Sequence, residues 1–191
     1  IGDLDGDGNP DLVVSNNAGP TVSVLLGDGA GSFSPKTDFP IGITPRKLAL
    51  GDLNGDGKLD LAVASGSGTV SVLLGNGTGG FGLKTDFATG NTYPRAVAIG
   101  DLNGDCKPDL AVATGDAISN TPVVSVLLGN GAGSFGLNTD IATGGETPRS
   151  VALGDFNGDG RADVAVAVGA GNFQGITVAV LLSLVPTGTT L

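Results

Sequence analysis

The stretch from Gly51 to Asp60 reads Gly-Asp-Leu-Asn-Gly-Asp-Gly-Lys-Leu-Asp, and versions of it occur four times along this chain of 191 residues. The other copies lie at 2–11, 100–109 and 154–163. Their leading aspartates are 49, 49 and 54 residues apart, at Asp3, Asp52, Asp101 and Asp155. Such a period is typical of repeat proteins in which each unit is one small group of secondary-structure elements.

Three further blocks keep the same spacing. Val-Ser-Val-Leu-Leu-Gly occurs at 22–27, 70–75 and 124–129, and it becomes Val-Ala-Val-Leu-Leu-Ser at 178–183. A second block ends in Phe33, Phe81 or Phe135, which are equivalent positions and are expected in the blade core. Thr-Pro-Arg or Tyr-Pro-Arg begins the next unit at 44–46, 93–95 and 147–149. We therefore predict one repeat domain over 1–185, with units at about 1–43, 44–92, 93–146 and 147–185 and a short tail at 186–191.

The apolar runs within one unit are short and rich in β-formers. In the second unit they cover 46–53, 60–65, 69–74 and 83–89, and Gly, Asn, Asp or Pro bounds each of them. Helical periodicity is absent from these runs, and 61–65 is almost continuously apolar, as in a strand buried on both faces. Four antiparallel strands in a unit of this length predict a β-propeller blade. A β-sandwich also fits the strand lengths, but it does not require the unit to recur.

The predicted fold class is therefore all-β, with propeller-type blades of four antiparallel strands in four repeats of about 49 residues. The first unit begins at the end of its first strand, and the fourth stops before its last strand, so both terminal blades are expected to be incomplete. The chain has neither an initiator Met nor a signal peptide, which suggests a mature form or a fragment. Edge strands left unpaired at the two ends would be open to strand addition.

Composition excludes several classes of function. The chain has 9 basic and 19 acidic residues, a net charge of −10, no histidine and one cysteine. Nucleic-acid binding needs a basic face, and imidazole catalysis and most zinc sites need histidine. A single cysteine forms neither an internal disulfide nor a cysteine metal cluster. No apolar run reaches the length of a membrane span, so membrane insertion is not expected.

The repeated acidic segment predicts a metal site. Side-chain oxygens at positions 1, 3, 5 and 9 can converge on one centre, and glycine at position 4 lets the backbone curl around it. An all-oxygen, carboxylate-rich set suits a hard cation, and the number of ligands favours Ca²⁺ over Mg²⁺. Position 7 varies in type and would offer its backbone carbonyl. The predicted metal-site residues are Asp3, Asp5, Asp7, Asn9, Asp11, Asp52, Asn54, Asp56, Lys58, Asp60, Asp101, Asn103, Asp105, Lys107, Asp109, Asp155, Asn157, Asp159, Arg161 and Asp163.

The distribution of charge supports the same interpretation. Thirteen of the 19 acidic residues lie in these loops, and four bound Ca²⁺ ions would bring the net charge of −10 to −2. Close carboxylates repel one another unless a cation neutralises them. The alternative is a set of acidic surface turns, since Asp, Asn and Gly also favour turns. An EF-hand is excluded because position 12 is valine in every copy, where that loop needs glutamate.

The combined motif closely resembles the FG-GAP/VCBS repeat. The residues that carry this resemblance are Asp-Leu-Asn-Gly-Asp-Gly-Lys-Leu-Asp-Leu-Ala-Val-Ala at 52–64, the Val-Ser-Val-Leu-Leu-Gly block and the Phe block. The resemblance implies integrin-α-like blades with Ca²⁺ held in the loop between the first two strands. It further implies that Asp3, Asp5, Asp7 and Asp11 and their counterparts are the side-chain ligands. The family propeller usually has about seven blades, so closure of the ring is left open.

Two departures from the repeat carry predictions. Cys106 occupies loop position 6, where the other copies have Gly8, Gly57 and Gly160. If the position needs a positive φ, the cysteine is strained, and the third site should bind Ca²⁺ most weakly. Units three and four are longer at 114–123 and 168–176, and these insertions could form a binding surface on one rim.

Three functions remain open at this point. The first is a non-catalytic, extracellular, Ca²⁺-stabilised module that binds a protein or glycan ligand in adhesion. The second is a structural subunit whose open blades pair with copies of itself into a ring or fibre. The third is an auxiliary part of a larger secreted enzyme. A catalytic site within this chain is not expected, because only six acids lie outside the loops. Three of these six recur in a Thr-Asp-Phe/Ile motif, which marks them as structural: Asp38, Asp86 and Asp140.

Overall fold

The computed structural model describes residues 1–42, 44–90, 92–115, 122–144, 147–169 and 176–182. These residues form strands, turns and bends and contain no helix. The first two sheets consist of β1 (Leu12–Asn16), β2 (Thr21–Leu25) and β3 (Thr37–Pro40), then β4 (Pro45–Gly51), β5 (Asp60–Ser65), β6 (Thr69–Leu73) and β7 (Thr85–Ala88). The last two consist of β8 (Pro94–Gly100), β9 (Asp109–Thr114), β10 (Val123–Leu127) and β11 (Thr139–Ala142), then β12 (Thr147–Gly154), β13 (Asp163–Gly169) and β14 (Ile176–Leu181).

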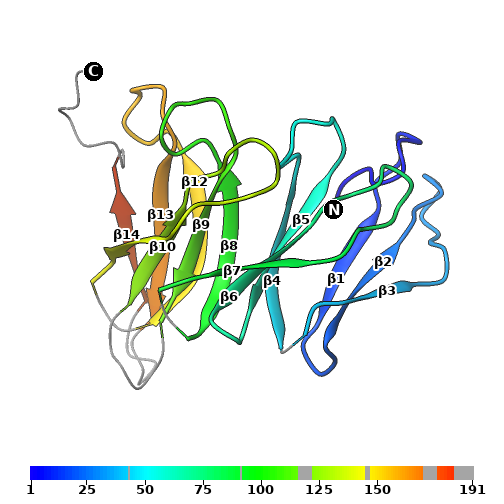
Figure 1. The fold of residues 1–191 in the computed structure, drawn as a ribbon, viewed down its shortest axis with the longest axis horizontal. Helices are drawn as coiled ribbons and strands as arrows, with labels where there is room; N and C mark the ends of the chain where they lie inside the picture. The colour runs from blue at the N-terminus through cyan, green and yellow to red at the C-terminus, as the bar shows by residue number, and fades with distance from the viewer. Residues whose placement is uncertain (43, 91, 116–121, 145–146, 170–175, 183–191) are drawn as a thin grey trace.

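Each sheet is one antiparallel meander, because consecutive strands pair through short connections. The four sheets follow one another along the molecule as blades, from blade 1 in blue to blade 4 in orange and red (Figure 1). The innermost strands β4, β8 and β12 contact one another in that order, as the inner strands of a propeller do. The described blades form an open arc with blades 1 and 4 at opposite ends (Figure 1). The predicted fold class is confirmed.

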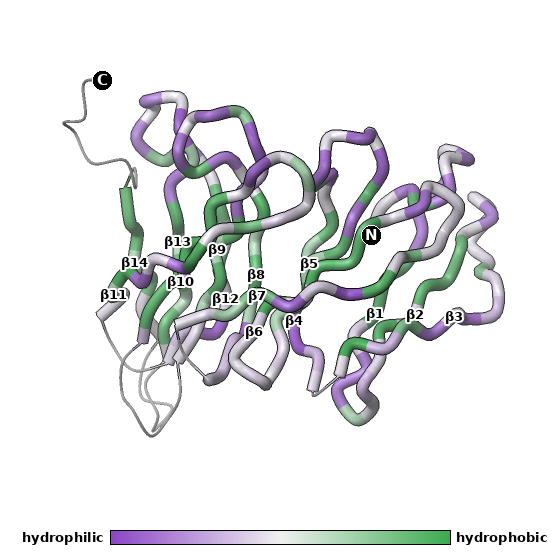
Figure 2. The backbone as a smooth tube through the Cα atoms, viewed as in Figure 1, coloured by the Kyte–Doolittle hydropathy of each residue, from purple (hydrophilic) through white to green (hydrophobic). Residues whose placement is uncertain are grey.

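The apolar cores lie between neighbouring blades. Every residue of β5 and of β9 is buried, which confirms the prediction from the continuous apolar run. Valines of β6, Val70 and Val72, pack with Val97 and Val112 of blade 3, and equivalent clusters lie between the other neighbours. The hydrophobic colouring accordingly follows the central strands of each sheet, whereas the loops are mostly hydrophilic (Figure 2). Each blade therefore depends on its neighbour to bury its face.

The terminal blades are incomplete among the described residues, as the sequence predicts. Strand β1 is the counterpart of β5, so blade 1 has only the bridge between Gly2 and Asp11 at the place of an inner strand. Blade 4 has three described strands. Most of the two longer connections predicted as a binding surface lies outside the described residues, as does the tail at 186–191.

The phenylalanine prediction is correct only in part. Phe81 packs edge-on against Phe39 of the preceding blade, and Phe135 packs in the same way against Phe87. Phe33 is 44% exposed, because its aromatic partner would come from a blade before blade 1. The recurring phenylalanine therefore indicates an aromatic contact between neighbouring blades, and the first copy, Phe33, lacks this contact.

Candidate metal centre

The acidic loops join the first two strands of each blade and share one set of hydrogen bonds. The carboxylate at position 1 accepts bonds from the backbone N–H groups of positions 4 and 6. For Asp52, Oδ1 accepts from Gly55 at 2.7 Å and Oδ2 from Gly57 at 2.8 Å. The same pairs form at the position-1 aspartates of the other loops, Asp3, Asp101 and Asp155. These bonds fold each loop around its first carboxylate.

The aspartate at position 9 is fully buried in all four loops. Asp60 accepts a bond from the N–H of Leu53 at 2.8 Å and another from the N–H of Gly75 at 2.7 Å. Asp11 and Asp109 make the same two bonds, one to the loop and one to the glycine two positions after the end of the third strand. The position-9 carboxylate thus connects the acidic loop to the far end of the third strand.

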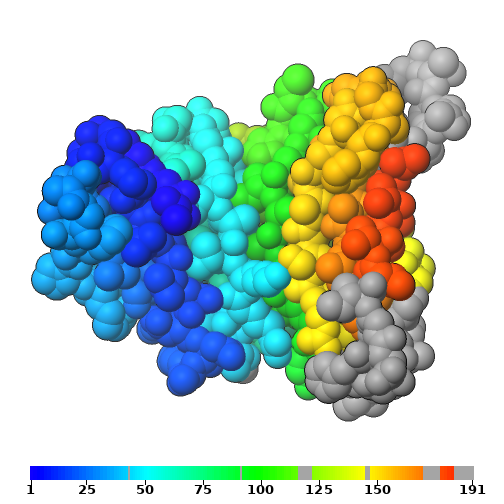
Figure 3. Space-filling model, turned by 180° about the vertical axis from the view of Figure 1, so that it is seen from behind, coloured from blue at the N-terminus to red at the C-terminus, as the bar shows by residue number. Residues whose placement is uncertain are grey.

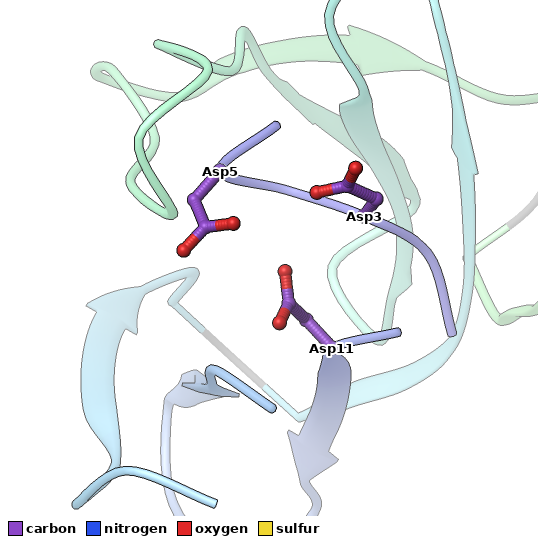
Figure 4. Close-up of side chains that lie close together, drawn as sticks. All are labelled: Asp3, Asp5 and Asp11. Carbon is purple, nitrogen blue, oxygen red and sulfur yellow. The ribbon is translucent and has the colours of Figure 1, made fainter. Parts of the chain in front are cut away.

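The first loop brings three carboxylates together. Single oxygens of Asp3, Asp5 and Asp11 all lie within 4.8 Å of one another, and the three side chains point toward a common centre (Figure 4). They occupy positions 1, 3 and 9. Asp7 at position 5 is not part of this group, and its two oxygens accept bonds from the backbone and side-chain nitrogens of Asn9 at 2.7 and 2.9 Å.

The other three loops differ because position 3 is asparagine, at Asn54, Asn103 and Asn157. Across the described part of the chain, no other three acidic side chains meet within the same distance. At position 5, Asp56 and Asp105 make exposed ion pairs with the position-7 lysines, with N···O distances of 3.7 and 3.6 Å. In these loops the amide oxygen at position 3 would replace the carboxylate of Asp5.

Backbone hydrogen bonds lower the pKa of Asp7 and Asp155, whereas other carboxylates of the loops have a raised pKa. Burial, together with the charges of Asp7, Asp11 and Asp3, raises the pKa of Asp5. Burial and the charges of Asp56 and Asp52 likewise raise the pKa of Asp60. Raised values mean that the folded protein disfavours the ionised carboxylates, and a bound cation would relieve this cost. The donor set of carboxylate and amide oxygens is the one Ca²⁺ prefers.

Cys106 adopts a φ of 62°, and its counterparts Gly8, Gly57 and Gly160 adopt 86°, 78° and 81°. The position therefore needs the left-handed region, as the sequence suggests. An added Cβ at the three glycines would meet nothing within 4 Å, so the strain at Cys106 is conformational rather than steric crowding.

Replacing Cys106 with glycine should raise the free energy of unfolding by about 1 kcal/mol, because glycine adopts this φ without cost. Urea denaturation of the two proteins measures the difference. The reverse substitution Gly57→Ala should lower stability by a similar amount. Equal stability of C106G and the wild type would contradict the assignment of strain.

Three of the acids outside the loops accept hydrogen bonds from serines within their own blades. Asp38, Asp86 and Asp140 each accept a bond of 2.6 Å from a serine hydroxyl of the adjacent strand, at Ser23, Ser71 and Ser125. This confirms their predicted structural role. Blade 4 has Ala179 where blade 3 has that serine.

Two features of the site were not predicted. One is the second bond of the position-9 aspartate, which reaches a glycine 15 or more residues away. The other joins neighbouring blades: the N–H of Gly79 donates to the carbonyl of Leu4 at 2.9 Å, and Gly133 to Leu53 at 3.0 Å. The only sequence signal for both is that the glycines recur at equivalent positions.

Solved structures with a similar fold include the crystal structure of BBS1N in complex with ARL6DN, soaked with lead. It is 16% identical with a TM-score of 0.57, over 95% of this chain and 56% of that chain. The V. cholerae biofilm matrix protein Bap1 is 17% identical with a TM-score of 0.47, over 95% of this chain and 36% of that chain. A search of curated proteins finds no match. Among the described residues, no helix is long and apolar enough to cross a bilayer.

The family comparison matches three overlapping segments, 3–63, 52–112 and 101–166, to the FG-GAP-like repeat. Each match starts at the position-1 aspartate of one loop and ends in the strand after the next loop. Together the matches cover most of the chain, and they follow the same period as the acidic loops and blades. The chain therefore belongs to the FG-GAP-like repeat family.

Proposed function

We propose that this chain is a non-catalytic, Ca²⁺-stabilised propeller-type module that acts outside the cell in adhesion or in binding a protein or glycan ligand. The observation that carries the proposal is the convergence of Asp3, Asp5 and Asp11 within 4.8 Å. The repeated fold of the other three loops supports one ion per loop. Extracellular modules bind Ca²⁺ at about 10⁻⁴ to 10⁻³ M, and such sites are filled outside the cell rather than in the cytosol.

The first loop should bind Ca²⁺ most tightly, because only it has a carboxylate at position 3. Asp5→Asn gives this loop the amide of the other three and should weaken its affinity at least about tenfold, by loss of one charge near a divalent ion. Isothermal titration calorimetry should show the tightest binding step weakened while the later steps are unchanged.

The matched control is Asp28→Asn, which removes one exposed charge outside the acidic loops. Asp28 accepts bonds from the N–H groups of Ala30 and Ser32, and the amide oxygen of asparagine can keep them. The control should bind Ca²⁺ like the wild type. Equal weakening in both variants would mean that only the net charge matters and would contradict a site at the first loop.

A second candidate function, assembly with copies of itself, is supported by the outward faces of the end blades. Val124 and Val126 of blade 3 are buried against blade 4, whereas their counterparts Val178 and Val180 are 66% and 48% exposed. At the other end, Val14 is 44% exposed, although its counterparts in the other blades are buried. These two faces lie at opposite ends of the molecule (Figure 3). A blade 1 face of one copy could therefore cover the blade 4 face of the next.

Light scattering coupled to size exclusion tests this second candidate. Head-to-tail packing predicts a mass that grows with protein concentration, since heterologous contacts need not close. Val180→Asp should reduce the association, and the control Leu83→Asp, at a 98% exposed side chain on the rim, should not. A discrete monomer at every concentration would contradict assembly without affecting the calcium proposal.

A further inference from the structure

Three arginines occupy one position in consecutive units. Arg46, Arg95 and Arg149 each follow the proline near the start of an innermost strand, β4, β8 or β12. This end of the strand is opposite to the acidic loop, which follows the other end. All three line a single pocket of about 340 Å³, which residues from every blade enclose: Ser15, Asn17, Pro45, Arg46, Lys47, Arg95 and Arg149. The pocket therefore lies where the starts of the inner strands β4, β8 and β12 meet the end of β1.

The backbone is irregular at each of these arginines. Where β8 pairs with β9, Pro94 lies opposite Thr114 and Ala96 lies opposite Ala113. Arg95 is therefore an extra residue on the inner strand. The same irregularity occurs at Arg149 in β12, and β4 has its register shift at Arg46 and Lys47. A bulge re-aims a side chain and disturbs the ladder, and bulges are frequent beside functional sites. Three bulges at equivalent positions direct three guanidinium groups to one place.

The charges in this pocket are unbalanced. Four of the five lysines form ion pairs with aspartates, at Lys36, Lys58, Lys84 and Lys107. Among the described residues, no ion pair includes Lys47 or the three arginines. Lys47 donates to the hydroxyl of Ser150 at 2.8 Å, and Arg95 donates to the carbonyl of Gly115 at 3.4 Å. Among the described residues, five cationic side chains are in no ion pair, and four of them line this pocket, the fifth being Arg161 in the fourth acidic loop.

The guanidinium group of Arg46 is also incompletely hydrogen-bonded. The Nε of Arg46 is buried and has no hydrogen-bond partner. The side chain of Arg149 lies against Gly169, where an added Cβ would approach its Nε to 2.6 Å. Burial and the charges of Arg46 and Arg149 lower the pKa of Arg95, as expected when like charges are held close together. A buried donor without an acceptor is destabilising, and an anion in the pocket would supply the missing acceptor.

We propose that this pocket binds a divalent tetrahedral oxyanion, a sulfate or phosphate group, between Arg46, Arg95 and Arg149. Guanidinium groups pair with such groups through two parallel N–H···O bonds, and the three positive charges favour a divalent over a monovalent anion. The pocket is larger than a free ion and open to solvent, so the same chemistry accepts a sulfate or phosphate ester that belongs to a sugar. Binding to this site is independent of the acidic loops, which lie at the other end of the inner strands.

Calorimetric titration with sodium sulfate tests the proposal, with ionic strength held constant by sodium chloride. The wild type should bind sulfate, and Arg95→Gln or Arg149→Gln should weaken binding at least about tenfold, since each removes a charged donor. Arg149→Lys keeps the charge but loses the planar fork, and it should bind with intermediate affinity. The matched control Lys36→Gln removes one exposed positive charge outside the pocket and the acidic loops, and it should bind sulfate like the wild type.

Thermal unfolding provides a second readout. Sulfate stabilises most proteins through its exclusion from their surface, so the informative quantity is the difference between variants. The wild type and K36Q should gain more in Tm from sulfate than R95Q does. Equal gains in all of them, or no calorimetric binding by the wild type at millimolar sulfate or phosphate, would overturn the proposal.

The source of the oxyanion is resolved by two further ligands, glucose 6-sulfate and glucose 6-phosphate. Tighter binding of an ester than of the inorganic ion would assign the site to a group carried by a larger ligand. Binding of the inorganic ions alone would assign it to a free ion. Neither result depends on Ca²⁺, so failure here leaves the proposed calcium function untouched.

Discussion

Replacing Asp60 with alanine should lower the free energy of unfolding by about 3–4 kcal/mol in calcium-free buffer. Asp60 is fully buried, and its two oxygens accept the N–H groups of Leu53 and Gly75. The alanine variant leaves both donors buried without an acceptor and separates the acidic loop from the end of β6. Chemical denaturation with chelator present measures the loss without any contribution from bound metal.

The control is Asp56→Ala in the same loop. Asp56 is exposed, and its ion pair with Lys58 lies at the surface, so this variant should lose less than about 1 kcal/mol. Asp60→Asn keeps one acceptor and should fall between the two. Equal destabilisation of D60A and D56A would contradict the assignment of a structural role to position 9.

Removing Ca²⁺ should have the largest effect on the wild-type protein. At a free concentration about ten times Kd, each occupied site adds about 1.4 kcal/mol to the free energy of unfolding, so four sites add about 5–6 kcal/mol. Chelation should therefore lower Tm substantially, and restored millimolar Ca²⁺ should bring it back. Differential scanning calorimetry with and without chelator measures this shift.

Magnesium at the same concentration is the matched control for that experiment. It should recover little of the lost Tm, because Mg²⁺ demands a tighter octahedron and gives up its water reluctantly. Full recovery with Mg²⁺ would indicate general screening of the acidic loops rather than a specific site. An unchanged Tm on chelation would contradict calcium stabilisation.

The blades could be predicted from the sequence because each signal is local. The continuous apolar run at 61–65 indicates a strand buried on both faces, and the structure has β5 there with every residue buried. Cys106 is similarly predictable, because the three glycines at its position in the other copies already indicate a positive φ. The structural role of Asp38 was also predictable, because its Thr-Asp-Phe motif recurs along the chain.

Contacts between distant residues could not be predicted in this way. The bond from Gly75 to Asp60 depends on the register of β5 with β6, and the exposure of Phe33 depends on which blade precedes it. The Pro-Arg pair was visible as a repeat, but its convergence on one pocket depends on the bulges and on the arc of the blades. The behaviour of position 5 was not predictable either, because Asp7 accepts a hydrogen bond from Asn9 and does not lie with Asp3 in the carboxylate group.

The number of Ca²⁺ ions bound per chain shows whether each acidic loop is a metal site. Equilibrium dialysis against millimolar Ca²⁺, followed by elemental analysis of the protein, counts them. One ion in each acidic loop predicts four ions per chain, with the third loop, which contains Cys106, the last to fill. No bound ion, or a count that stays the same when Asp3, Asp52, Asp101 and Asp155 are all replaced by alanine, would contradict the account.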